Sequence, residues 1–533
     1  MRKRKHRDEK PLAVMARDID TAGKIAVISP EEEAALNSFR KPIVLLRKKE
    51  GCSLDHLSDN NYIGIMLPYT PLHCLLLADG PELLVMTSAN LSDLPIIYKN
   101  DQALKELHGI ADGFLLHDRE IVTRCDDSLI RIFRGREYPL RRSRGYVPYP
   151  VRIGTEGVRT DAGDSGGILA CGAEQKASFA LTKGDLVFTS QHIGDLKNIE
   201  AFDNYAGQIR HFEKMFDIEV NEIVCDLHPD LMSSDYARAR ASKDGIKLHM
   251  VQHHHAHMAS CMADNSLSGK CIGIIWDGTG YGTDGTIWGG EFFTGDYTGF
   301  ERAGSIRPVK LAGGDLAVRE IWRCAAALLE DAGIDSREFF SGRLKGSKQD
   351  RLGAVISQLK MNINCPVSGG MGRLFDGVSA MLGLRYNVSY EGQGAVLLEA
   401  AAGSSEGSYP YAITEIYGPD GIVKRSEFDS RDMVRAICKD IEKGRDSSLI
   451  AADFMNTLVL MAVEMCEKIR KISGLSRVVL SGGTFQNMYL LERIVSGLSD
   501  AGFEVFTHRR AAANDEGISL GQAAIIFFSK KQI

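Results

Sequence analysis

The chain has 533 residues, of which 44% are hydrophobic and 25% charged, a composition that excludes a disordered or fibrous protein. The 64 Lys and Arg and 70 Asp and Glu give a formal net charge of −6, so no overall basic field favours nucleic acid as a partner. The 11 cysteines are odd in number and never spaced C-x-x-C, and no apolar run reaches the roughly 20 residues of a membrane span. We therefore expect a cytoplasmic protein without a membrane partner.

Residues 1–150 alternate short apolar runs with helical stretches, which predicts an α/β domain. The apolar runs lie at residues 42–46, 63–67, 83–86 and 128–133. A polar, glycine-rich stretch follows and predicts a linker, which we place at residues 151–167.

A second α/β unit is expected over residues 168–533, and it contains no short tandem repeat. Its predicted elements are strands at 168–172 and 178–182, a helix at 200–216, a strand at 222–226, helices within about 310–360, and a last strand at 477–480 before a further helix.

The segment Val251-Gln-His-His-His-Ala-His257 carries histidines at the spacing of one helical turn. If the segment is helical, His253 and His257 lie on one face, where two imidazoles can hold a metal ion. Asp277, at the end of a buried strand, and Asp515, at the end of a predicted strand near the C-terminus, offer two carboxylates. This donor set suits Fe²⁺ or Zn²⁺ without choosing between them. A solvated or core histidine cluster remains the alternative.

Glycine turns are the candidates for a nucleotide cradle, because the chain has no G-x-x-x-x-G-K-[ST] loop. Each of these turns follows a strand, where backbone N–H groups can approach phosphates without an intervening Cβ. The candidates are Gly172, the Asp277–Gly285 turn with Gly278 and Gly280, and the pair Gly482 and Gly483, after which a helix begins. Lys176 and Asp376 are candidates for contacts to phosphate and ribose hydroxyls. Ordinary tight turns and surface charges are the alternative interpretation.

Four polar residues of the first domain can neutralise and orient an anion such as a phosphate or a carbamate. They are Lys5 and Arg7 near the start of the chain, and Ser88 and Asn90 in the run Thr87-Ser-Ala-Asn90. A basic segment and a turn of this composition are also common without any such role.

The ordered motifs of the whole chain resemble the HypF carbamoyltransferases that mature NiFe hydrogenases. In residues 1–150 the resemblance to a YrdC-like domain rests on Lys5–Leu12, Met66–His73, Thr87–Asn90, His117–Arg119, Cys125–Ser128 and Arg144–Pro148. In residues 168–533 the resemblance is to a TsaD-like domain of the two-lobed actin/Hsp70-like (ASKHA) class. It rests on Ser190–Leu196, Asp226–Asp230, His253–His257, Trp276–Gly282, Gly313–Glu320, Met371–Asp376, Tyr390–Gln393 and Ser481–Gly483.

The resemblance implies that carbamoyl phosphate and ATP give carbamoyl-adenylate, with Mg²⁺ accompanying ATP, and that the carbamoyl group passes to the C-terminal cysteine of a HypE-type acceptor for cyanide-ligand synthesis. By the same resemblance, the residues that match the adenylate-forming site are Lys5, Arg7, Ser88 and Asn90. The residues that match the metal ligands are His253, His257, Asp277 and Asp515. The residues that match nucleotide contacts are Gly482, Gly483, Asn487 and Asp376.

Two departures from the family pattern stand out. The acylphosphatase domain and the zinc-finger cysteines usual in the family are not found here, and Met1 falls inside the YrdC-like domain, so we expect an N-terminally truncated chain. Around the fourth metal-ligand candidate, the chain has Asn514-Asp-Glu516-Gly where Asn-Asp-Gly-Gly is usual. We expect Glu516 to perturb the local turn or the charge balance of the metal.

Three alternatives remain open at this stage. An O-carbamoyltransferase acting on a small hydroxylated metabolite would use the same domains, but in the opposite order. Synthesis of threonylcarbamoyl-adenosine on tRNA also uses both domain types, and the fused order weighs against it. A truncated, non-catalytic remnant would retain the motifs without the reaction.

Overall fold

The computed structural model describes residues 1–7, 9–52, 54–91, 94–154, 166–418, 421 and 423–530. Residues 155–165 of the expected linker therefore lie outside the described residues. The chain forms two compact units, and each is described by itself. Unit 1 comprises Met1–Val251, Met262–Leu267 and His508–Ile533, and unit 2 comprises Gln252–Cys261 and Ser268–Thr507.

The first sheet of unit 1 occupies the N-terminal residues and has the strand order β5-β1-β4-β3-β6-β7, with β2 paired to β3. Its strands are β1 Ala13–Ala16, β2 Ala26–Val27, β3 Ile43–Lys48, β4 Tyr62–Met66, β5 Leu83–Met86, β6 Leu129–Phe133 and β7 Arg136–Arg141. Its helices are α1 Arg2–Lys5, α2 Ile19–Ile25, α3 Pro30–Asn37, α4 Pro71–Ala78 and α5 Asn100–Glu106. The α/β pattern expected of the first 150 residues is present.

The second sheet of unit 1 has the order β13-β12-β9-β10-β11-β8. Its strands are β8 Val151–Arg152, β9 Gly167–Ala170, β10 Ala180–Lys183, β11 Leu186–Thr189, β12 Val220–Asp226 and β13 Lys247–Val251. The accompanying helices are α6 Ile199–Phe216, α7 Met232–Asp244, the short 3-10 helix η2 Asp515–Gly517 and α18 Ile518–Ser529. Helix α6 matches the helix predicted at 200–216, because its apolar positions recur at helical spacing.

Unit 2 contains a sheet with the main order β19-β20-β16-β15-β14-β21-β22, joined by β17 and β18. Its strands are β14 Cys271–Tyr281, β15 Ile287–Asp296, β16 Gly299–Ile306, β17 Val309–Lys310, β18 Val367–Ser368, β19 Ala412–Tyr417, β20 Val423–Asp429, β21 Arg477–Ser481 and β22 Glu504–Phe506. Its helices are α9 Asp315–Arg319, α10 Trp322–Asp331, α11 Ser336–Phe339, α12 Ser347–Met361, α13 Met371–Met381, α14 Gln393–Ala401, α15 Arg431–Glu442, α16 Ser447–Ser473, the 3-10 helix η1 Gly483–Gln486 and α17 Met488–Asp500.

The same strand topology occurs once in each unit. In unit 1, β9, β10 and β11 form an antiparallel set, and β12 and β13 extend the sheet in parallel from β9. In unit 2, β14, β15 and β16 form the antiparallel set, and β21 and β22 extend the sheet in parallel from β14. This repetition agrees with the two-lobed domain expected from the sequence.

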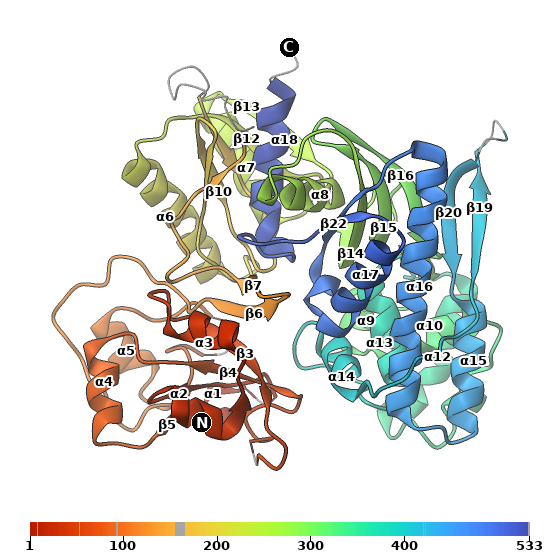
Figure 1. Ribbon diagram of the computed structural model, residues 1–533, viewed down its shortest axis with the longest axis horizontal. Helices are drawn as coiled ribbons and strands as arrows, with labels where there is room; N and C mark the ends of the chain where they lie inside the picture. The colour runs from red at the N-terminus through yellow and green to blue at the C-terminus, as the bar shows by residue number, and fades with distance from the viewer. Residues whose placement is uncertain are drawn as a thin grey trace. The chain divides into compact units, whose positions relative to one another are not determined.

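Helix α16 is long and apolar enough, by length and composition, to cross a membrane. However, 67% of its most apolar window is buried inside the structure. The helix packs against α14, α15 and α17, and Figure 1 shows it running beside α17. Its apolar length is therefore explained by its position in the core of unit 2.

The last segment of unit 1 is anchored on Asp264, at the C-terminal end of α8 (His253–Asp264). The buried Asp264 carboxylate accepts hydrogen bonds from the backbone N–H groups of Arg509 (2.6 Å), Arg510 (2.9 Å) and Ala511 (3.2 Å), and from Nε of Arg510 (3.0 Å). Burial alone raises the pKa of Asp264, but hydrogen bonds from His508 and these amides outweigh burial and hold the pKa well below its usual value. The carboxylate thus stays ionised in the folded protein.

We predict that Asp264→Asn lowers the free energy of unfolding by about 3 kcal/mol. The asparagine NH₂ group would replace an accepting oxygen, so that buried N–H donors would face another donor and lose their hydrogen bonds. Since the pKa is lowered on folding, this stabilisation is present above the unfolded carboxyl pKa and is lost only in strong acid. Urea unfolding at neutral pH measures the loss. Asp235→Asn, which removes an exposed pair with Arg238, is the control and should cost less than about 0.5 kcal/mol.

Candidate active site

The histidine cluster of unit 2 is formed by the first turns of α8, which follow directly on β13. His253 and His257 lie one helical turn apart, as predicted, and their ring centroids are 5.0 Å apart. Both side chains are buried, His257 completely. The cluster is therefore not solvated, and the alternative of a core histidine cluster stays open.

A bulge in β14 brings Asp277 to these histidines. Trp276 pairs with Gly290 and Gly280 pairs with Trp288, so three residues of β14 oppose the single residue Gly289 of β15. Asp277 is the first residue of this bulge, and it lies within the strand rather than at its end as we expected. A bulge bends a strand and redirects the side chain that it carries.

The three side chains have the geometry of a metal site. Oδ2 of Asp277 is 3.5 Å from Nε2 of His253 and 3.6 Å from Nε2 of His257. The donor atoms all lie within 4.8 Å of one another. An ion with four ligands and bonds of about 2.1 Å places neighbouring donors about 3.4 Å apart, so the spacing fits a bound ion.

The electrostatics agree with this donor set. Burial alone raises the pKa of Asp277, but hydrogen bonds and charges from His253 and His257 outweigh burial and hold the pKa well below its usual value. The backbone N–H of Gly483 also donates to Oδ1 of Asp277, at 3.1 Å. The carboxylate is therefore ionised and fixed in orientation, as a metal ligand must be.

Gly278 and Gly280 differ in what surrounds them. A Cβ on Gly280 would lie 2.4 Å from Cε1 of His254 and 2.9 Å from Cδ2 of His253, whereas the nearest atom to a Cβ on Gly278 would be 3.8 Å away. Gly280 is therefore needed to make room for the histidines of α8. Its expected contact with a nucleotide remains a prediction.

Other predicted nucleotide contacts also lie in unit 2. Gly482 has φ 109°, and a Cβ there would lie 2.2 Å from the carbonyl oxygen of Trp276, so only glycine fits. Asn487 is the N-cap of α17, and its Oδ1 accepts from the N–H of Leu490 at 3.0 Å. The amide side chain of Asn487 thus already serves a structural purpose.

Asp376 on α13 is a buried acid rather than a surface charge. It lies 2.9 Å from the guanidinium of Arg373, which is also buried. Burial raises the pKa of Asp376 to about 6, although Arg373 opposes the rise. Arg373 belongs to the Met371–Asp376 motif, and the sequence pattern alone did not indicate its contact with Asp376.

Lys176 and Asp515 belong to unit 1. Lys176 is half-buried and has a left-handed backbone, with φ 47°. Asp515 begins η2, directly before α18, and does not end a strand as we expected. The membership of these two residues in the nucleotide and metal sites remains a prediction.

The residues beside Asp515 bond to the end of β7 and to residues outside that strand. Asn514 donates from Nδ2 to the carbonyl of Leu140 (2.9 Å), and Glu516 accepts from the N–H of Arg142 (2.5 Å) and lies 3.4 Å from Nδ1 of His192. Leu140 is the extra residue at a register shift of β7, so its carbonyl is available to Asn514. The carboxylate of Glu516 is thus directed to contacts within unit 1.

Three of the four adenylate-site candidates come together. Nζ of Lys5 donates to Oγ1 of Thr87 (2.9 Å), the carbonyl of Ser88 (2.5 Å) and Oδ1 of Asn90 (3.1 Å), and Oγ of Ser88 also donates to Asn90 (2.8 Å). Thr87, in the same Thr87–Asn90 motif, was not among the predicted site residues, but it also contacts Lys5.

Arg7 makes its own contacts, donating to the backbone carbonyl of Pro11 at 2.6 Å. It lies near enough to act on Lys5 electrostatically. Burial and the charge of Arg7 together lower the pKa of Lys5 to about 8. A cation that already lacks full solvation is suited to bind an anion.

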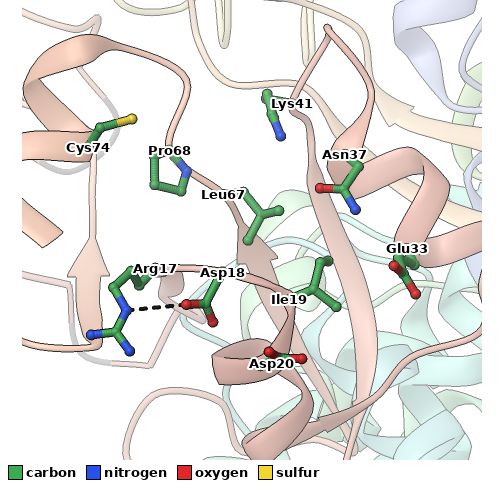
Figure 2. A pocket seen from close by; sticks show the side chains of 10 residues that line it. All are labelled: Arg17, Asp18, Ile19, Asp20, Glu33, Asn37, Lys41, Leu67, Pro68 and Cys74. Carbon is green, nitrogen blue, oxygen red and sulfur yellow. Dashed lines mark hydrogen bonds and ion pairs between the residues drawn. The ribbon is translucent and has the colours of Figure 1, made fainter. Parts of the chain in front are cut away.

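A cavity of about 490 Å³ opens in the same N-terminal part of unit 1 (Figure 2). Its walls combine cations, carboxylates, an amide and a thiol with two apolar side chains and a proline. The lining residues are Arg17, Asp18, Ile19, Asp20, Glu33, Asn37, Lys41, Leu67, Pro68 and Cys74. None of the predicted adenylate-site residues lines this cavity, and it was not predicted from the sequence.

Family models match three consecutive parts of the chain. Residues 1–143 match the model described as "Telomere recombination", which is the Sua5/YrdC domain. Residues 163–264 match the "HypF Kae1-like domain", and residues 273–522 match "Carbamoyltransferase, Kae1-like Domain, second subdomain". The expected α/β fold, with a YrdC-like domain first, is thereby confirmed, and the models describe the second domain, expected to be TsaD-like, as Kae1-like.

Curated relatives and solved structures agree with these models. The chain is 36% identical to carbamoyltransferase HypF of Synechocystis sp. over 98% of this chain and 67% of that protein. It is 36% identical to carbamoyltransferase HypF2 of Cupriavidus necator over 98% of this chain and 68% of that protein. A full-length HypF solved in its phosphate- and nucleotide-bound form matches with TM-score 0.92 and 41% identity, over 99% of this chain and 80% of that one. HypF of T. kodakarensis matches with TM-score 0.88 and 33% identity, over 100% of this chain and 69% of that one.

We predict that Gly280→Ala weakens the affinity for Zn²⁺ by about tenfold or more, because the added methyl group displaces His253 and His254. Gly278→Ala is the matched control, since its methyl group makes only an ordinary van der Waals contact, 3.8 Å from the guanidinium of Arg373, and it should bind Zn²⁺ as the unchanged protein does. Competition with a chromophoric chelator measures both affinities. Equal affinities for the two variants would show that Gly280 does not position the histidines.

Proposed function

Because the chain belongs to the HypF family of carbamoyltransferases, we propose that it uses carbamoyl phosphate and ATP to form carbamoyl-adenylate. In the second step of this proposal, the carbamoyl group passes to the C-terminal cysteine of a HypE-type acceptor. The resulting thiocarboxamide supplies the cyanide ligand of a NiFe hydrogenase. The setting of this reaction is the cytoplasm, with no membrane or nucleic acid partner.

In the proposed first step, water cleaves carbamoyl phosphate into carbamate and inorganic phosphate. The carboxylate of carbamate then attacks the α-phosphate of ATP, and pyrophosphate leaves. The cations Lys5 and Arg7, with Ser88 and Asn90, bind and orient the anionic groups, and Mg²⁺ accompanies ATP. The observed contacts of Lys5 with Ser88 and Asn90 support this assignment. AMP is then the leaving group in the second step, which makes the carbamoyl carbon a competent acyl donor.

The cluster of His253, His257 and Asp277 carries the second step of the proposal. These residues would hold Fe²⁺ or Zn²⁺, with Asp515 as the proposed fourth ligand. When bound, the ion acts as a Lewis acid that stabilises negative charge on the carbonyl oxygen during attack by the acceptor thiolate. The three side chains are buried, and a site that excludes water protects an acyl donor from hydrolysis.

Nucleotide contacts are proposed for Gly278, Gly280, Gly482, Gly483, Asn487, Asp376 and Lys176. Support for nucleotide binding comes from the nucleotide-bound relative that is 41% identical to this chain. The division into residues 1–150, 151–167 and 168–533 also stays a proposal.

The competing functions differ in the acceptor. A HypF-type model over both Kae1-like parts favours the hydrogenase reaction over an O-carbamoyltransferase or tRNA modification. The intact buried donor set weighs against a non-catalytic remnant.

We expect the purified chain to release pyrophosphate from ATP only when carbamoyl phosphate is present. His253→Ala should release pyrophosphate at an unchanged rate and fail to label a HypE C-terminal peptide from ¹⁴C-carbamoyl phosphate, because this residue is assigned to transfer. A coupled pyrophosphate assay and peptide labelling measure the two steps. No release with carbamoyl phosphate contradicts the proposed adenylation by this chain, and labelling by His253→Ala contradicts the metal assignment.

We further expect pyrophosphate release to fall as the pH rises through about 8, where Lys5 loses its proton. The neutral amine no longer attracts phosphate oxygens, so the Michaelis constant for ATP should rise. Lys5→Arg keeps its charge over this range and should move the fall to higher pH. Identical pH profiles for the two proteins would show that Lys5 does not determine the pH dependence.

A further inference from the structure

The end of β21 contacts His257 on the side away from Asp277. Oγ of Ser481 lies 3.3 Å from Nδ1 of His257, while Nε2 of the same ring faces Asp277 at 3.6 Å. Ser481 and His257 are both completely buried. The hydroxyl is therefore placed to fix the ring in one orientation, with Nε2 directed at the carboxylate.

The same turn contacts the second ligand, Asp277. The N–H of Gly483 donates to Oδ1 at 3.1 Å, which leaves Oδ2 as the oxygen that faces the two imidazoles. The two oxygens thus have separate partners. A Cβ on Gly483 would lie 2.9 Å from Oδ1, so a larger residue would push the carboxylate away.

Gly482 allows the turn to come this close. Its φ of 109° and its packing against the backbone of Trp276 bring β21 next to the bulge of β14. The segment Ser481–Gly483 consequently contacts two of the ligand side chains. It contacts His257 at Nδ1 and Asp277 at Oδ1, the atoms that point away from the proposed ion.

We propose that Ser481 is a positioning residue for the metal centre and that Ser481–Gly483 forms its second ligand shell. This inference rests on the proposed metal site. Coordination through Nε2 requires that the proton of neutral His257 be on Nδ1, which then donates to Oγ of Ser481. The sequence predicts a nucleotide contact at this turn, and the turn thereby has a second role that needs no nucleotide.

The test measures Co²⁺ binding to the full chain without nucleotide, by titration and by the visible absorption of the bound ion. Ser481→Ala should bind Co²⁺ about tenfold more weakly with an altered spectrum, because His257 is free to rotate. Ser481→Thr keeps the hydroxyl and should retain the spectrum. Gly483→Ala should also weaken binding, through displacement of Asp277.

Ser336→Ala is the matched control, since Ser336 is another completely buried serine of unit 2, bonded to the carbonyl of Ala326 at 3.2 Å. It should lose a similar amount of stability and bind Co²⁺ normally. Unchanged binding and spectrum in folded Ser481→Ala would overturn the inference; if that variant does not fold, unchanged Gly483→Ala would do so. His257→Ala separates the two levels: if it binds Co²⁺ as the unchanged protein does, the metal site itself is wrong.

Discussion

The burial of the Asp277 carboxylate against two imidazoles is the interaction on which the centre of unit 2 depends. A buried charge is costly unless it is paired, and here His253, His257 and the N–H of Gly483 provide the partners. The bulge of β14 turns the side chain of Asp277 toward α8. The opposing residue, Gly289, accommodates the bulge because it has no Cβ. A Cβ there would lie 2.7 Å from the carbonyl oxygen of Asp277.

Glycines at this centre serve close packing as much as ligand binding. Gly280 leaves room for the rings of α8, and Gly482 lets β21 approach the backbone of Trp276. Both are also proposed nucleotide contacts. The residues that shape the proposed metal centre and those assigned to the nucleotide therefore lie in the same turns. A change in the backbone of such a turn would alter both sites.

The segment that carries Asp515 is held within unit 1 on both sides. Upstream, the buried carboxylate of Asp264 accepts hydrogen bonds from the backbone N–H groups of residues 509–511. Around Asp515, the side chain of Asn514 bonds to the backbone of β7, and that of Glu516 bonds to the backbone of Arg142, which follows the strand. Glu516, the departure from the family pattern, thus serves to fasten a loop to the YrdC-like sheet, and a glycine in its place lacks the carboxylate for that contact.

The sequence by itself determined the α/β class, through its alternation of short apolar runs and helical stretches. It also determined helix α6 and the placing of His253 and His257 on one helix face, because helical periodicity acts within a few residues. Tertiary structure alone decided the bulge at Asp277, the anchor at Asp264 and the contact of Ser481 with His257. These features join residues far apart in the chain: 224 positions separate Ser481 from His257, and 245 separate Asp264 from Arg509. Local propensity carries no record of such contacts, because they form only when strands and helices pack and each buried polar group must find a partner.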